Sequence, residues 1–85
     1  MANPEPLFYT RMLKLKGEVQ LLNRGTLKFW ATDGVHTLEV IAFGMSSLKE
    51  SLLQADYFDL VYTPKIDNWR QPESIILEAK DIFFK

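Results

Sequence analysis

Lys28 and Trp30 lie two residues apart in a short alternating run, residues 26–32, and their types suit contact with a planar, anionic ligand. If this run is a β-strand, both side chains lie on one face, while the apolar residues between them lie on the other. A large aromatic ring beside an ammonium group on a sheet surface suits a stacked nucleobase and its phosphate. The pattern therefore predicts a surface for single-stranded nucleic acid.

Catalysis within this chain has little support in the sequence. The one histidine, His36, follows a turn, and it has no cysteine partner because the sequence contains no Cys. No set of serine, histidine and acid can be placed on neighbouring elements. The carboxylates are scattered over strands and turns, without a helical pair or the spacing of a metal-binding loop. We therefore expect no catalytic residue, metal site or cofactor in this chain, and His36 to be an exposed turn residue.

Length and composition predict one small globular domain. The chain has 85 residues, of which 47% are hydrophobic, and its net charge is −1. A free-standing nucleic-acid binder is usually basic, so strong autonomous DNA binding is disfavoured, and any such role must depend on a local patch. No apolar run approaches the ~20 residues of a membrane span, and no signal peptide is apparent. The absence of cysteine fits a reducing cytoplasm, and we expect no membrane association.

The first half of the chain reads as three strands. Residues 11–22 alternate in polarity with Gly17 near their centre, which predicts one long strand bent or bulged at the glycine. The second strand and a third strand that ends at Gly44 flank Asp33-Gly34. This dipeptide predicts a hairpin with a type I′ turn, in which both central residues have positive φ.

The second half reads as a helix and two strands. Ser47 and Glu50 match a capping box, which predicts the start of a short amphipathic helix. A fourth strand is expected over residues 57–63 and a fifth over residues 74–84. The polar residues 64–73 between them are expected to form a loop.

Three strands, a helix and two strands, with the first strand bent, match the OB-fold, a closed five-stranded Greek-key barrel. The expected class is all-β, with one short helix between the third and fourth strands. Closure of the barrel removes the exposed edges of an open sheet. Residues 1–10, which contain two prolines, are expected to form an extended lead-in before an OB-fold domain at residues 11–85.

Several stretches of the chain, in order and spacing, resemble the OB domain of RecJ, a bacterial exonuclease specific for single-stranded DNA. The resemblance covers nearly the whole chain. The stretches are Asn3-Pro4-Glu5-Pro6-Leu7-Phe8, Asp33-Gly34, Ile41-Ala42-Phe43-Gly44-Met45, Asp56, Tyr62-Thr63-Pro64, Asn68-Trp69 and Ile76-Leu77-Glu78-Ala79-Lys80-Asp81-Ile82.

This resemblance implies a non-catalytic fragment of a larger 5′–3′ exonuclease in the bacterial cytoplasm. Catalysis in that family belongs to separate domains, whose Asp and His motifs bind manganese or magnesium. The OB domain helps to hold the single strand as it enters the active site. The expected partners of this chain are therefore single-stranded DNA and the catalytic domains of its parent.

OB-folds hold single strands across their second and third strands, between the loops that follow the first and fourth strands. On that arrangement Trp30 stacks a base and Lys28 meets a phosphate, with Glu39 across the hairpin as a counter-charge. The other expected DNA contacts are loop residues, with Trp69 as a second stacking platform: Arg24, Lys65, Trp69 and Arg70.

A second interpretation makes the domain a docking module without direct DNA contact. Ile41 and Phe43 share the nominally solvated face of the third strand, so they are either covered by the helix or free to dock another domain. With Trp30, they would bind the catalytic domains or another protein, and the neutral net charge favours this interpretation. Lys14 and Lys16 point outward on the first strand, either as an extension of a basic track or as ordinary solvated lysines.

Overall fold

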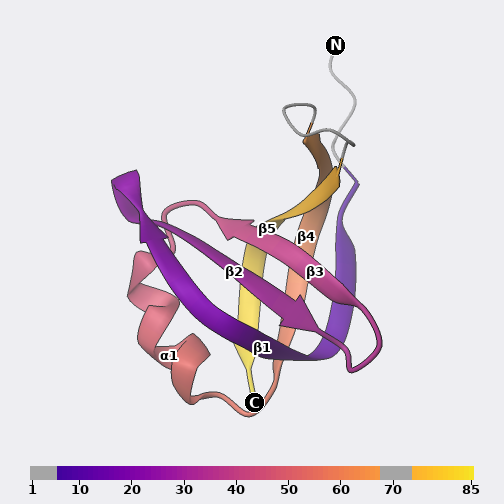
Figure 1. The fold of residues 1–85 in the computed structure, drawn as a ribbon, viewed down its shortest axis with the longest axis horizontal. Helices are drawn as coiled ribbons and strands as arrows, with labels where there is room; N and C mark the ends of the chain where they lie inside the picture. The colour runs from indigo at the N-terminus through magenta and orange to yellow at the C-terminus, as the bar shows by residue number, and fades with distance from the viewer. Residues whose placement is uncertain (1–5, 68–73) are drawn as a thin grey trace.

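The computed structural model describes residues 6–67 and 74–85, which form a closed five-stranded barrel with one short helix (Figure 1). The strands are ordered β1-β2-β3-β5-β4 around the barrel, and β4 pairs with β1 to close it. This arrangement confirms the predicted all-β OB-fold, with its helix between the third and fourth strands. The elements are β1 (Phe8–Leu22), β2 (Thr26–Thr32), β3 (Thr37–Ala42), α1 (Lys49–Gln54), β4 (Phe58–Asp67) and β5 (Ser74–Phe84), with 3-10 turns at η1 (Asn23–Gly25) and η2 (Ser46–Leu48).

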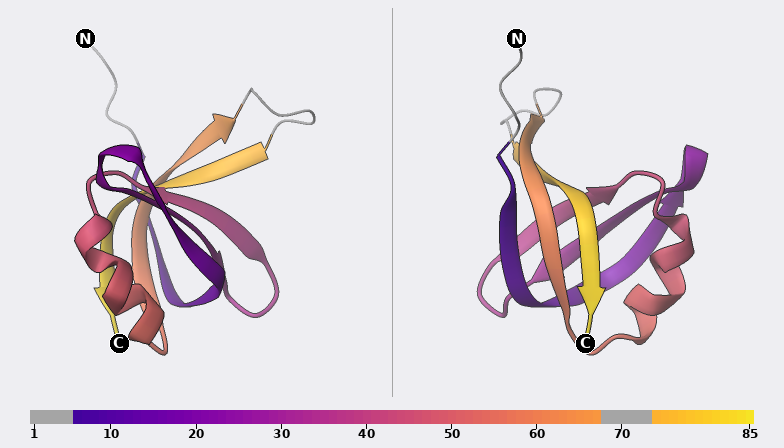
Figure 2. Two further views of the ribbon diagram at one scale, coloured as in Figure 1. Left: turned by 60° about the vertical axis from the view of Figure 1, so that its left-hand side comes forward. Right: turned by 180° about the vertical axis from the view of Figure 1, so that it is seen from behind.

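The long strand β1 closes the barrel because its two halves pair with different neighbours. Its second half pairs with β2 and its first half with β4, so the strand curls around one side of the molecule (Figures 1 and 2). The register against β2 shifts between Lys16 and Gln20, and Gly17 has a φ of 79° inside this bulge. A glycine adopts such a conformation without the steric cost of a Cβ atom. The predicted bulge at Gly17 is confirmed.

A second irregularity in β1 was not apparent in the sequence. The register against β4 shifts between Thr10 and Leu13, and Met12 has a φ of 59°. A non-glycine residue in this region is uncommon and is held there by its surroundings. The strand also begins at Phe8, so residues 8–10, which we assigned to the lead-in, pair with residues 60–62 of β4. Cross-barrel pairing, rather than local alternation, places them in β1.

The core lies inside the barrel, where inward side chains of all five strands meet. Phe29 and Phe58 pack edge to face, with ring centroids 6.0 Å apart. Helix α1 lies beside the barrel (Figure 2) and contributes Leu52, which is 1% exposed. The buried apolar residues form one cluster: Leu13, Val19, Leu27, Phe29, Ala31, Val40, Ala42, Leu52, Phe58, Leu60, Leu77, Ala79 and Ile82. One continuous core rigidly positions the strands whose outer faces are described below.

The predicted type I′ turn at Asp33-Gly34 is wrong. The hairpin loop spans residues 33–36, and only its glycine, with a φ of 98°, has positive φ. The Asp33 carboxylate accepts hydrogen bonds from the backbone amides of Val35 and His36, at 2.8 and 2.6 Å. An aspartate side chain that accepts hydrogen bonds from the backbone amides of its own loop stabilises a longer connection than a two-residue turn.

The predicted capping box at Ser47 and Glu50 is also wrong. The 3-10 turn η2 precedes α1, and Leu48 at the helix N-cap makes no side-chain hydrogen bond. The Leu48 amide instead donates to the Met45 carbonyl, at 2.9 Å. A 3-10 turn satisfies backbone groups at a helix start without a side-chain cap, and α1 is consequently short.

Strand β4 is longer than predicted, because it continues through Pro64 to Asp67 in residues expected to form a loop. The pairing with β5 extends to the far ends of both strands, which project beyond the barrel (Figure 1). Pro64 pairs with Leu77, past the end of the seam with β1 at Tyr62. A proline is tolerated there because its missing N–H is not needed by a second neighbouring strand. The predicted bounds of the fifth strand, residues 74–84, are confirmed.

Candidate nucleic-acid interface

Trp30 lies on the outer face of β2, as the alternation predicts. Its side chain is 42% exposed, whereas Phe29 and Ala31 on either side are buried in the core. Lys28 lies on the same outer face and is half-buried. The rigid core beneath the strand fixes where the indole ring is presented, which lowers the entropic cost of binding a planar ligand there.

Trp30 lines an open cleft of about 690 Å³ between the first residues of β3, 37–39, and the projecting ends of β4 and β5. Phe8 and Tyr62 also line it, with stacked rings whose centroids lie 6.0 Å apart at an interplanar angle of 24°. The Thr10 and Tyr62 hydroxyls share a hydrogen bond of 2.9 Å, which helps to fix the Tyr62 ring. We call this the aromatic cleft; its main lining residues are Phe8, Trp30, Tyr62, Pro64, Ile75 and Leu77.

The sequence analysis missed Phe8 and Tyr62 as members of this cleft. Phe8 was placed in the lead-in, and Tyr62 was treated as an alternating strand residue. They meet because β1 pairs with β4 in the register that sets Phe8 opposite Tyr62. This long-range register has no local sequence signal.

Lys28 is paired with a buried carboxylate. Its Nζ atom lies 2.9 Å from Oε2 of Glu39, whose side chain is 3% exposed, and Glu39 is the cross-strand partner of Trp30. The expected pairing of these two charges is therefore confirmed. A buried carboxylate needs such a partner because removing a charge from water is costly. The positive charge of Lys28 is partly neutralised at the position where a phosphate was expected.

Lys65 lies in β4 rather than in a loop, which corrects its predicted setting. Its Nζ atom lies 3.8 Å from Oε2 of Glu78, and the same oxygen lies 3.2 Å from Nζ of Lys80. Glu78 also neighbours β3, since it pairs with Ile41 across the parallel seam. Lys65 and Lys80 thus flank one carboxylate on β4 and β5.

Arg24 is not at the aromatic cleft. It lies in η1, with a φ of 62°, at the end of β2 that is farther from Trp30. There it lines a separate groove of about 750 Å³, which also contains exposed Leu21, Leu22 and Phe43, and half-buried Ile41. The predicted contacts Trp69 and Arg70 fall outside the residues that the structure describes.

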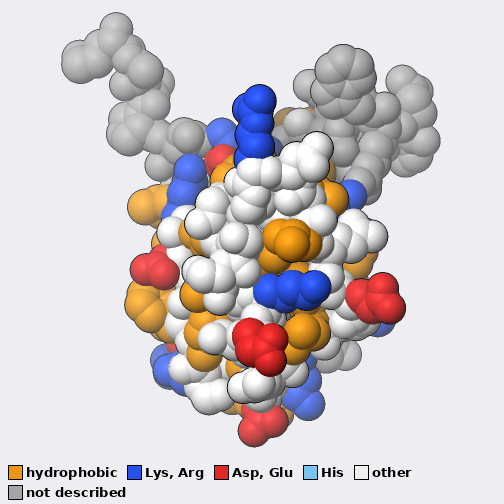
Figure 3. Space-filling view, turned by 90° about the vertical axis from the view of Figure 1, so that its left-hand side faces the viewer, with side chains coloured by type: hydrophobic (Ala, Val, Ile, Leu, Met, Phe, Trp, Pro, Cys, Tyr) orange, Lys and Arg blue, Asp and Glu red, His pale blue; other side chains and the backbone are white. Residues whose placement is uncertain are grey.

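Charges of both signs are interspersed on the face that carries α1 (Figure 3), in keeping with the net charge of −1. His36 is exposed, as predicted, and its Nδ1 atom lies 3.5 Å from Oδ2 of Asp33. Within residues 6–67 and 74–85, no three His, Cys, Asp or Glu side chains gather as a metal site would require. Among the same residues, no helix has the length and apolar character needed to cross a bilayer.

A second polar cluster lies at the seam of β1 and β4 and centres on Asp59, whose side chain is 1% exposed. Its Oδ2 atom accepts a 2.8 Å hydrogen bond from the Tyr9 hydroxyl and lies 3.3 Å from Nζ of Lys85. Its Oδ1 atom accepts a 3.0 Å bond from the Met12 amide, at the bulge of β1. The Asp59 carboxylate therefore accepts the hydrogen bond of a backbone amide, that of Met12, which lies in the bulge where the strand pairing is interrupted.

These contacts shift two ionisation equilibria. The hydrogen bond from the Met12 amide, with those from Tyr9 and Lys85, lowers the pKa of Asp59 against the opposing effect of burial. The hydrogen bond to Asp59 raises the pKa of Tyr9, together with desolvation and the negative charge of the carboxylate. In the hairpin loop, the backbone amides of His36 and Val35 lower the pKa of Asp33. Each carboxylate is thus stabilised in its charged form by donors from the fold itself.

The strand order, the bent first strand and the helix between β3 and β4 define an OB-fold domain, with an aromatic cleft beside the outer face of β2. A family model described as the RecJ OB domain matches residues 1–81. The chain belongs to this family. No curated protein and no solved structure matches it.

Proposed function

We propose that this chain is a non-catalytic single-stranded-DNA-binding domain of a RecJ-like 5′–3′ exonuclease. It would hold the DNA strand for catalytic domains elsewhere in the parent chain, where manganese or magnesium would serve the hydrolysis in the bacterial cytoplasm. The observation that carries this proposal is the aromatic cleft, which is lined by Trp30 and by the stacked pair of Phe8 and Tyr62. Membership of the RecJ OB family supports the assignment to such a parent.

The cleft suits bases better than it suits a folded partner. Aromatic and aliphatic side chains line it together with the polar residues Thr37, Glu39 and Ser74, and a base stacked on an aromatic ring gains ~1–3 kcal/mol without regard to sequence. Lys28, which pairs with Glu39 of the cleft, and Lys65, which follows Pro64 of the cleft in β4, would contact phosphates. Trp69, Arg70 and, farther away, Arg24 are proposed as further contacts. Binding of this kind is weak and sequence-independent.

The decisive variant is Trp30→Ala, tested by the anisotropy of a labelled oligo(dT). Because a stacking platform is lost, we expect the affinity to fall about tenfold, within the range for one base. Phe43→Ala is the matched control, since this aromatic is also exposed but lines the other groove. Equal affinities of the Trp30→Ala variant and the unsubstituted chain for oligo(dT) would show that Trp30 is not part of the site.

A second candidate function, docking of the parent's catalytic domains, is favoured by the groove around Phe43. Leu21 and Phe43 are 57% and 56% exposed there, and large exposed apolar side chains that gather on one surface often mark an interface. Salt dependence separates the two functions. DNA binding through phosphates weakens as salt rises, with a slope of roughly −0.7 per neutralised phosphate on single strands. No measurable binding of oligo(dT) even at low salt would favour docking.

A further inference from the structure

Two lysines of β1 lie beside Trp30 on the side away from Glu39. Lys16 is the cross-strand partner of Trp30, and Lys14 is the partner of Thr32 at the next outward position. Both lysines are exposed. Along a strand, successive residues on one face are ~7 Å apart, so the two lysines occupy neighbouring positions along β1, starting beside Trp30.

These lysines differ from the other lysines near the cleft in their partners. Lys28 is paired with Glu39, whereas Lys65 and Lys80 are both beside Glu78. Lys14 and Lys16 have no ion pair with any carboxylate in the described part of the chain, and the sole acidic residue of β1 is Glu18. Among those residues, the Nζ atom of Lys16 donates a hydrogen bond only to the Oγ1 hydroxyl of Thr37, at 3.4 Å. Unneutralised positive charge next to Trp30 is therefore concentrated on β1.

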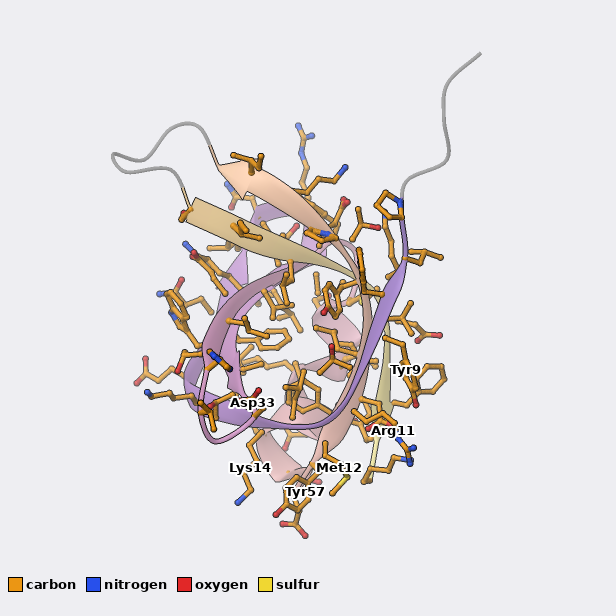
Figure 4. The ribbon with its side chains drawn as sticks, turned by 90° about the vertical axis from the view of Figure 1, so that its right-hand side faces the viewer. Tyr9, Arg11, Met12, Lys14, Asp33 and Tyr57 are labelled. Carbon is orange, nitrogen blue, oxygen red and sulfur yellow. The ribbon has the colours of Figure 1, made fainter. Side chains whose placement is uncertain are left out.

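Lys14 is also held in position. Its Nζ atom lies 5.0 Å from the centroid of the Tyr57 ring, a distance typical of a cation–π contact. Figure 4 shows Lys14 and Tyr57 projecting from the same rim of the barrel, near Asp33. These residues border a shallow pocket of about 240 Å³, which is also lined by Met12. The carboxylate of Asp33 is occupied by the loop amides of Val35 and His36 and by His36 itself, so it offsets the charge of Lys14 only in part.

We propose that the bound single strand leaves the aromatic cleft across β1, where Lys16 and then Lys14 bind its phosphates and the Tyr57 pocket bounds the track. This inference rests on the proposed function and extends its site to a strand outside the surface formed by β2 and β3. Two features carry it: the cross-strand pairing of Lys16 with Trp30, and the lack of a carboxylate partner for either lysine among the described residues. A DNA strand on this path crosses β3 and β2 and then follows β1 from Lys16 to Lys14.

The test is the double variant Lys14→Gln with Lys16→Gln, assayed by anisotropy with two lengths of oligo(dT). For an oligonucleotide of about twelve nucleotides, long enough to occupy the track, we expect about fivefold weaker binding. The salt slope should become shallower by ~1.4, which corresponds to two lost phosphate contacts on a single strand. For an oligonucleotide of about four nucleotides, which fills the cleft and reaches at most Lys16 beside Thr37, affinity should fall much less.

Lys49→Gln is the matched control, because this lysine lies on α1 and also has no ion pair among the described residues. It should change neither affinity nor slope. If the double variant binds both lengths as tightly as the unsubstituted chain does, the proposed lysine track is wrong, but the proposed binding at the aromatic cleft is unaffected. If the double variant weakens both lengths equally, the lysines act on the cleft and the proposed path is also wrong. If the unsubstituted chain binds no oligo(dT), the proposed function and the proposed track are both wrong.

Discussion

Asp59 and Glu39 are both buried carboxylates within salt-bridge distance of a lysine, but they lie in regions of different character. At the seam of β1 and β4, Asp59 accepts hydrogen bonds from the Met12 amide and the Tyr9 hydroxyl, so its oxygens are used by the fold. On the seam of β2 and β3, Glu39 pairs with the side chain of Lys28 and lies opposite exposed Trp30. The first carboxylate stabilises strained backbone; the second limits the charge of a candidate binding surface.

The comparison shows that burial and a perturbed pKa do not by themselves mark a functional site. The pKa of Asp59 is lowered, yet its donors Tyr9 and Met12 belong to the β1 strand that closes the barrel against β4. Structural ion pairs perturb ionisation as readily as catalytic ones. The exposed Trp30 ring opposite Glu39 distinguishes the candidate binding surface from the structural region around Asp59.

The largest effect is expected from Asp59→Asn. The amide group keeps the volume of the side chain but cannot accept hydrogen bonds at both positions, and Lys85 loses its counter-charge. We expect the Tm to fall by ~10 °C or more, because a charged, multiply bonded group is lost from a small domain. Glu39→Gln is the comparison variant, since Lys28 is 31% exposed and can turn to solvent. An equal loss of Tm in thermal unfolding of the two variants would remove the distinction between the regions.

Acid unfolding tests the same region. Because the pKa of Asp59 is lowered in the folded protein, the unfolded chain binds this proton more readily. The resulting stability is fully present above the unfolded pKa of ~4 and is lost as pH falls through the lower folded value. Asp33 contributes in the same direction. The Tm, measured from pH 6 down to about 2, should fall less steeply in Asp59→Asn than in the unsubstituted chain. Parallel curves would show that Asp59 does not cause this loss of stability in acid.

The glycine bulge of β1 lies beside β2, between the partners of Trp30 and Lys28, and should have an intermediate effect. A Cβ atom at Gly17 would meet no other atom within 4 Å, so Gly17→Ala tests its φ of 79° alone. We expect a loss of about 1 kcal/mol in the free energy of unfolding, the cost of a left-handed conformation for an L-residue. Glu18→Ala is the neighbouring control in chemical denaturation. No loss in Gly17→Ala would mean that the bulge relaxes into another geometry.

The smallest effect is expected in the binding region itself. Glu39→Gln removes a negative charge beside Lys28, and we expect about threefold tighter binding of oligo(dT) at low salt. The gain should shrink as salt rises, because the interaction is electrostatic. Glu50→Gln on exposed α1 serves as the control. Unchanged or weaker binding by Glu39→Gln would show that this carboxylate does not restrain the binding surface.

Local patterns predicted the fold class well, because each strand and its inward face follow from alternation. Trp30 was placed outward for that reason, and Gly17 was identified as the site of a bulge. The errors arose where one structure replaced another of similar energy. The Asp33 side chain formed a longer loop in place of a tight turn, and the η2 turn replaced a side-chain cap.

The binding surface was predictable only in part. Lys28, Trp30 and Glu39 are neighbours on one hairpin, so their proximity follows from short-range pairing. Phe8 and Tyr62 are brought together by closure of the barrel, and Lys16 is set opposite Trp30 by the register beyond the bulge. A bulge of unknown size changes which residues face one another, so sequence alone does not give these partners.

The seam between β3 and β5 is the shortest in the barrel: it is parallel and joins residues 39–41 to residues 76–78, directly beside the aromatic cleft. Few backbone hydrogen bonds hold it, so amides there should exchange with solvent sooner than those of the long β4–β5 ladder. Opening at this seam would widen the cleft and leave the other four seams paired. The shortest seam of the barrel would then set how wide the aromatic cleft can become.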